Sequence, residues 1–76
     1  EYYAVTGQVL NRSEKPVQSV QVLVTIYGFG EVVLDTTTTH VGSLNPGEIR
    51  AFSVRFGSVD NIETVYRHEC VATYQR

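Results

Sequence analysis

Apolar and polar residues alternate along much of this chain, most regularly in residues 19–27. The apolar positions of that segment are Val20, Val22, Val24 and Ile26. Successive side chains of a strand point to opposite faces, so a period of two indicates a strand that buries one face. The sequence lacks a segment that repeats apolar residues at the three- and four-residue spacing of a helix. The pattern therefore predicts an all-β fold.

Two further strands are predicted at residues 2–10 and 49–56. In the first, Gly7 occupies the apolar face without a side chain, which predicts either a bulge or an aromatic ring lying close to it. In the second, the residues predicted to be buried are Phe52, Val54 and Phe56.

Glycine and proline mark the connections between strands. Residues 28–30 read Gly-Phe-Gly and predict a hairpin connection into a Thr-rich strand at residues 31–38. Residues 45–48 predict a type II turn, because Pro46 fixes φ at the second position and Gly47 accepts a positive φ at the third.

The last predicted strand covers residues 63–74. Because side chains alternate between the two faces of a strand, we expect Arg67 and Glu69 to face water and Cys70 to face the inner side. We therefore expect the thiol of Cys70 to be buried and slow to react. Together these segments predict an antiparallel β-sandwich of six or seven strands. We expect the first strand and the Thr-rich strand to be its exposed edges.

The size and charge of the chain narrow the range of possible functions. The chain has 76 residues, enough for one domain (residues 1–76), and a net charge of −2 without any run of Lys or Arg. This composition argues against a nucleic-acid partner. Its apolar runs are far shorter than the roughly 20 residues that span a bilayer, so we expect no direct membrane insertion.

The chain starts at Glu1 and contains no Met, which predicts that it is a domain cut from a longer protein. Cys70 is its single cysteine, so an internal disulfide is excluded. A small domain held by packing alone disfavours a eukaryotic secreted origin, and it is compatible with a bacterial or archaeal exported protein and with the cytosol.

Candidate chemistry is sparse in this sequence. His40 and His68 lie on different segments without the spacing of metal ligands. Ser58, Asp60 and Asn61 offer fewer oxygen ligands than a typical calcium-binding loop. We therefore expect no catalytic, cofactor-binding or metal-binding residues, and predict that the domain is not an enzyme.

Asn11-Arg12-Ser13 matches the N-glycosylation acceptor triplet. Such triplets arise often by chance. Asn11 follows a predicted strand, and its side chain is better explained as hydrogen-bonding nearby backbone in a turn.

Several of these segments together resemble the FxLYD domain, over about residues 3–74. The matching features are Gly7-x-Val9-x-Asn11, the strand ending in Tyr27 with Gly30 after it, Leu44-x-Pro46-Gly47-Glu48, and Phe52-x-Val54. Tyr27 matches the motif that names the family, whereas Val24, Ile26 and Gly28 depart from it. The chain is also similar to the CARDB-type adhesion sandwich. Both resemblances imply an immunoglobulin-like fold and an extracytoplasmic location in bacteria or archaea.

The expected function is a non-catalytic interaction or spacer module of a larger exported or cell-surface protein. Its partner would be another protein or a neighbouring domain of the same chain, contacted through Tyr2, Tyr3 and Phe29. The alternative is an accessory domain of an extracytoplasmic enzyme, which contacts a ligand or carbohydrate through these rings and Tyr74. An exposed row of aromatic rings would favour the alternative.

Overall fold

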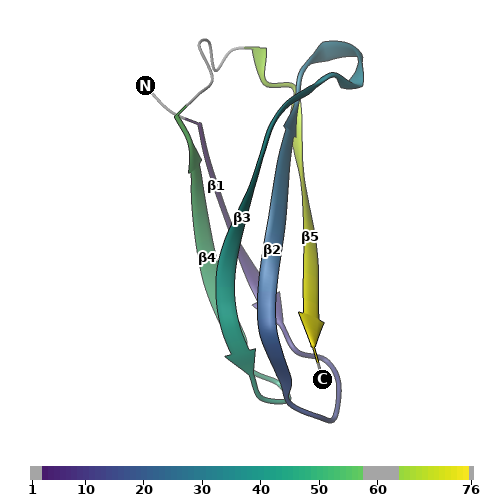
Figure 1. The fold of residues 1–76 in the computed structure, drawn as a ribbon, viewed down its shortest axis with the longest axis vertical. Helices are drawn as coiled ribbons and strands as arrows, with labels where there is room; N and C mark the ends of the chain where they lie inside the picture. The colour runs from purple at the N-terminus through teal and green to yellow at the C-terminus, as the bar shows by residue number, and fades with distance from the viewer. Residues whose placement is uncertain (1–2, 58–63, 76) are drawn as a thin grey trace.

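The computed structural model describes residues 3–57 and 64–75 of the chain. These residues form five strands and one short 3-10 helix, η1, in an elongated molecule (Figure 1). In chain order the elements are β1 (Tyr3–Leu10), β2 (Val17–Tyr27), η1 (Phe29–Glu31), β3 (Val33–Leu44), β4 (Ile49–Phe56) and β5 (Arg67–Gln75). The sequence predicts six or seven strands for the whole chain, and five lie in the described ranges.

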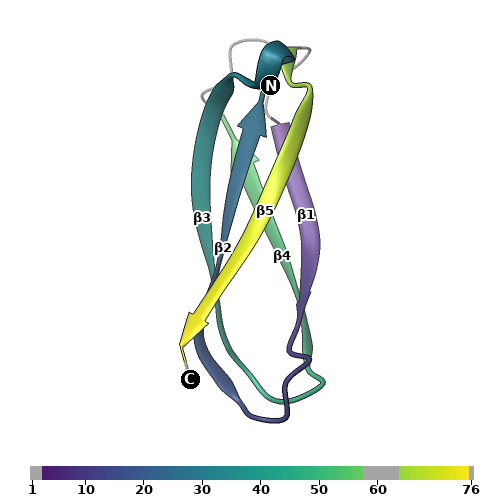
Figure 2. The ribbon, with the colours of Figure 1, turned by 90° about the vertical axis from the view of Figure 1, so that its right-hand side faces the viewer.

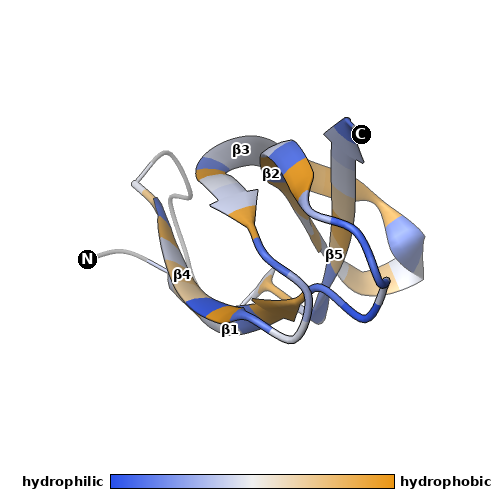
Figure 3. Cartoon of the chain, turned by 90° about the horizontal axis from the view of Figure 1, so that it is seen from below, coloured by the Kyte–Doolittle hydropathy of each residue, from blue (hydrophilic) through white to orange (hydrophobic). Residues whose placement is uncertain are grey.

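The strands form two antiparallel sheets, which confirms the predicted all-β class. One sheet has the order β1-β4 and the other the order β3-β2-β5. The sheets face each other in a sandwich-like arrangement, and apolar and polar residues alternate along the ribbons (Figure 3). The main core lies between them and consists of Val5, Val22, Val24, Ile26, Val54 and Phe56.

Of the two alternatives predicted for Gly7, a bulge or a nearby aromatic ring, the structure confirms the ring. It pairs with Phe52 across β1 and β4, and the Phe52 ring lies over it. A Cβ atom on Gly7 would be 2.7 Å from that ring, closer than carbon atoms approach without displacement. Phe52 is only half-buried, so its predicted burial is wrong, whereas Val54 and Phe56 are buried as predicted.

The Thr-rich strand is longer than the sequence predicts. β3 begins at Val33 and continues to Leu44, beyond the predicted end at residue 38. Val41 is an extra residue between the pairs that His40 and Gly42 make with β2, and Gly42 has a φ of 98°. A β-bulge of this kind lets a strand continue past an irregular segment.

The predicted parity of the last strand is right, but the predicted burial of its cysteine is wrong. Cys70 pairs with the buried Val24, so its side chain lies on the inner face of the sheet. It is nevertheless exposed. β5 pairs with β2 as an end strand, and the main core lies between β2 and the β1-β4 sheet, so most of the inner face of β5 has no second layer above it. An inward position is buried only where a second layer lies above it.

Candidate interaction surface

The side of the sandwich between β1 and β5 is open. At the upper end the two strands approach each other, and the Tyr3 hydroxyl lies 3.3 Å from Nδ1 of His68. From there β5 crosses the molecule diagonally, and its lower end lies far from the lower end of β1 (Figure 2). The inner face of β5 therefore loses its cover toward the carboxyl end of the strand.

A groove of about 410 Å³ occupies this open side. Its lining is mostly apolar and consists of Val9, Leu10, Asn11, Arg12, Ser13, Val17, Val20, Leu44, Ala72 and Tyr74. Three of these residues, Val17, Val20 and Leu44, are buried and form a second small core cluster. Leu10 and Tyr74 remain 43% and 52% exposed at its margins. The arrangement presents apolar surface that the described residues leave uncovered.

Asn11 fixes the lower end of this groove. It is the buried polar residue of the core, and its Nδ2 donates hydrogen bonds to the carbonyls of Lys15 (2.9 Å) and Leu44 (3.0 Å). Its Oδ1 accepts hydrogen bonds from the backbone N–H and the hydroxyl of Ser13. The predicted turn role of Asn11 is confirmed. The amide nitrogen that a glycan would modify is committed to two hydrogen bonds with backbone carbonyls.

The turn at residues 45–48 holds the same end of the molecule. Gly47 has a φ of 78°, as the sequence predicts, and its N–H donates to the carbonyl of Asn11. The Glu48 carboxylate accepts bonds from the backbone N–H of Asn45 and from the guanidinium of Arg50, both at 2.8 Å. These bonds, the backbone one foremost, lower the pKa of Glu48.

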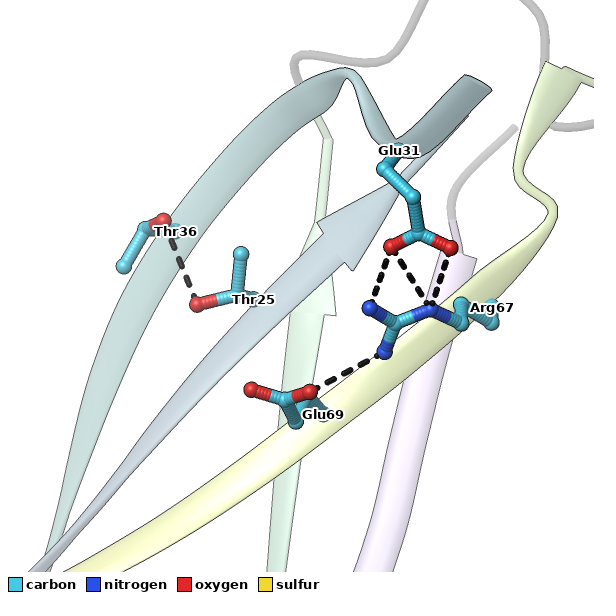
Figure 4. Close-up of polar contacts among 5 residues, drawn as sticks. All are labelled: Thr25, Glu31, Thr36, Arg67 and Glu69. Carbon is cyan, nitrogen blue, oxygen red and sulfur yellow. Dashed lines mark hydrogen bonds and ion pairs between the residues drawn. The ribbon is translucent and has the colours of Figure 1, made fainter. Parts of the chain in front are cut away.

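A charged cluster lies on the outer face of the three-stranded sheet (Figure 4). Arg67 donates to the carboxylates of Glu31 and Glu69, and its guanidinium lies 4.1 Å from the centre of the Tyr27 ring. Hydrogen bonds from Arg67 lower the pKa of Glu31, and the two carboxylates raise the pKa of Arg67. The cluster joins η1 to the start of β5, and its cation is fully engaged by its neighbours.

Two of the predicted contact residues, Tyr3 and Phe29, lie near the start of β5. Tyr2 is outside the described residues. Tyr3 is half-buried against His68, and Phe29 in η1 is 69% exposed with its ring centre 5.2 Å from that of Tyr66. The predicted edges are confirmed for β1 and β3, but the prediction missed that β4 and β5 are also end strands of their sheets.

The possible metal ligands are not brought together. His40 pairs with Gln21 on the outer face of β3, whereas His68 pairs with Ile26 on the inner face of β5. In the described residues, no group of three or more His, Cys, Asp or Glu side chains is placed to hold a metal ion. The calcium-loop candidates Ser58, Asp60 and Asn61 lie outside the described residues.

Within residues 3–57 and 64–75, no helix has the length and apolar character needed to cross a membrane. In comparisons with known proteins, no family model, curated protein or solved structure matches this chain. The resemblance to the FxLYD and CARDB-type domains therefore stays a prediction.

Proposed function

We propose that this chain is a non-catalytic, immunoglobulin-like interaction module of a larger exported or cell-surface protein from a bacterium or archaeon. The observation that carries the proposal is the apolar groove between β1 and β5, bordered by the free edge of β5. The location rests on the resemblance to the FxLYD domain. The partner is a protein, or a neighbouring domain of the same chain.

The mechanism would be addition of an extended segment along the open side. An end strand presents unpaired backbone N–H and C=O groups, which supply hydrogen bonds to an added strand. Apolar side chains on one face of that strand would then lie in the groove, above the buried residues Val17, Val20 and Leu44 at its base. Specificity would come from the margins, where Leu10 and Tyr74 stand exposed.

An NMR comparison tests this function. Backbone amide shifts of the isolated chain are compared with those of the same chain, segmentally labelled, within its parent protein. We expect changes to cluster in β1, in β5 and in the loop that follows Leu10. Unchanged amides in those elements, or hydrolytic activity that depends on His40 or His68, would contradict the proposal.

One observation favours an accessory, carbohydrate-contacting role as the second candidate. The rings of Phe29 and Tyr66 are both largely exposed and adjacent, at an interplanar angle of 46°. Sugars pack on such rings. Titration with cellohexaose and with chito-oligosaccharides, comparing wild type with Phe29→Ala, tests the role. Binding that the variant loses would support it, and an absence of binding by the wild type would count against it.

A further inference from the structure

β5 has a sequence that is symmetric in chemical character about its central residue. The strand has nine residues, Arg67 to Gln75, and Val71 is the middle one. On both sides of Val71 the first residue is small and the second is polar. The third residue carries a ring, and the fourth is polar again. The four matched pairs are Cys70 and Ala72, Glu69 and Thr73, His68 and Tyr74, and Arg67 and Gln75.

The free edge of β5 is also regular over most of its length, and its charged residues lie in the first half of the strand. From Arg67 to Thr73 the strand pairs with β2 in unbroken register, so no bulge twists this edge away. The strand contains no Pro or Lys, and within it no charged residue follows Glu69. Natural sheets usually protect an end strand by one of these devices. β5 has one register shift opposite β2, after Thr73, whereas β3, the other end strand of this sheet, has three.

We infer that the partner at this surface is a second copy of the chain, whose β5 pairs antiparallel with β5 across a two-fold axis at Val71. The inference rests on the proposed function as an interaction module and names its partner. A two-fold interface requires a self-complementary surface, and a strand symmetric about its centre supplies one. The product is a continuous sheet in the order β3-β2-β5-β5-β2-β3, with an antiparallel central pair.

Each residue of β5 then lies opposite its matched counterpart in the second copy. On the inner face Cys70 meets Ala72 of the second copy, and His68 meets Tyr74 of the second copy. On the outer face Val71 meets Val71, so two half-exposed apolar side chains cover each other. The inner row of the second copy lies over the mouth of the groove between β1 and β5, which the single chain leaves open.

Charge disfavours the registers whose centre lies closer to the start of β5. With Val71 at the centre, Glu69 lies opposite Thr73 of the second copy, with Val71 and Gln75 as its diagonal neighbours. Moving the centre to Cys70 makes the two Glu69 side chains diagonal neighbours, and moving it to Glu69 sets them directly opposite. Like charges in opposed positions destabilise a strand pair. The register at Val71 also keeps all nine residues of each strand paired.

Sedimentation equilibrium of the 76-residue chain tests the dimer, with Val71→Lys as the disrupting variant. Val71 is 48% exposed on the outer face, so a lysine there is compatible with the folded single chain but sets two ammonium groups opposite each other in the dimer. Val33→Lys is the matched control, because Val33 is 57% exposed on the other end strand of the same sheet. Circular dichroism verifies that both variants are folded.

We expect the weight-average mass of the wild type and of Val33→Lys to rise with concentration from 8.5 kDa toward twice that value. Val71→Lys should keep the single-chain mass over the same range. A wild type that stays monomeric at all concentrations overturns the inference and leaves the groove to a segment of a different protein, which the NMR comparison above detects. Disruption by Val33→Lys but not by Val71→Lys overturns it in favour of β3.

Cysteine cross-linking tests the register separately and does not depend on Val71→Lys. In Ala72→Cys, Cys70 of each copy lies opposite the introduced thiol of the other, and opposed residues in antiparallel strands have Cα atoms about 4.5–5.5 Å apart, within disulfide range. Oxidised glutathione should convert this variant to covalent dimers while being reduced. Thr73→Cys is the control, because residue 73 lies on the other face from Cys70. Equal cross-linking of the two variants, or of neither, contradicts the register.

Discussion

A single buried amide organises the lower end of the molecule. Asn11 donates to two carbonyls through Nδ2 and accepts from Ser13 through Oδ1, so both ends of its side chain are used. Aspartate has nearly the same shape but only acceptor oxygens when ionised. At this position it would place a negative charge beside the carbonyls of Lys15 and Leu44, without a proton to share.

Asn11→Asp should therefore destabilise the fold by about 3 kcal/mol, since a buried charged group without its hydrogen bonds costs more than a neutral one. Urea unfolding at pH 7 measures the change. Gln18→Glu, the same amide-to-carboxylate change at an exposed position, is the control and should have little effect. Similar unfolding midpoints for both variants would show that the Asn11 bonds contribute little.

The two phenylalanines of β4 differ in burial, and their truncations should differ accordingly. Phe56→Ala removes a ring that is 1% exposed in the main core, and we expect a loss of about 3–5 kcal/mol. Phe52 is half-buried over Gly7, so Phe52→Ala should cost less. Urea midpoints of the two variants provide the comparison. A larger loss of stability for Phe52→Ala would contradict this prediction and show that the contact of Phe52 with β1 contributes more than the burial of Phe56.

At the scale of elements, the turn before β4 depends on a conformation that favours glycine. Gly47 has a φ of 78°, and a residue with a branched side chain is strained there. Gly47→Val should cost on the order of 1 kcal/mol or more by this strain. Gly57→Val is the control, because Gly57 is outside the positive-φ region and has open space around it. Thermal unfolding measures both, and equal losses would contradict the turn assignment.

At the scale of the whole molecule, the relative extent of the two sheets determines which side chains meet solvent. The β1-β4 sheet leaves most of the inner face of β5 without a second layer, and Cys70 is exposed there. Partial desolvation by its apolar neighbours still raises the pKa of the Cys70 thiol above its ordinary value of 9.0. Exposure therefore favours reaction of the Cys70 thiol, whereas the raised pKa disfavours it.

We expect a disulfide reagent such as DTNB to label Cys70 in dilute native protein without denaturant. Because the raised pKa lowers the fraction of thiolate near neutral pH, labelling should accelerate as the pH rises. At a fixed pH, unfolding in urea should increase the rate, since it restores the lower pKa. Labelling that requires denaturant at every pH would mean that another segment covers the inner face of β5.

Local patterns in the sequence determined most of the strands and turns. Alternation around Val22 and Val24 fixed the buried face of β2, because the side-chain period of a strand is independent of its neighbours. Gly47 and Asn11 were predictable for the same reason: a positive φ and a side chain bonded to nearby backbone are local properties. The link at residues 40–43 was not predictable, because the bulge at Val41 depends on pairing with β2.

Only the tertiary structure decided what lies beside each strand. The parity of β5 was right from its sequence, yet the exposure of Cys70 depends on where the opposite sheet ends. The groove likewise exists because β1 and β5 diverge after the contact between Tyr3 and His68, which are 65 residues apart. Burial and open edges are relations between distant segments, and a pattern that repeats every two residues carries no information about which segment faces it.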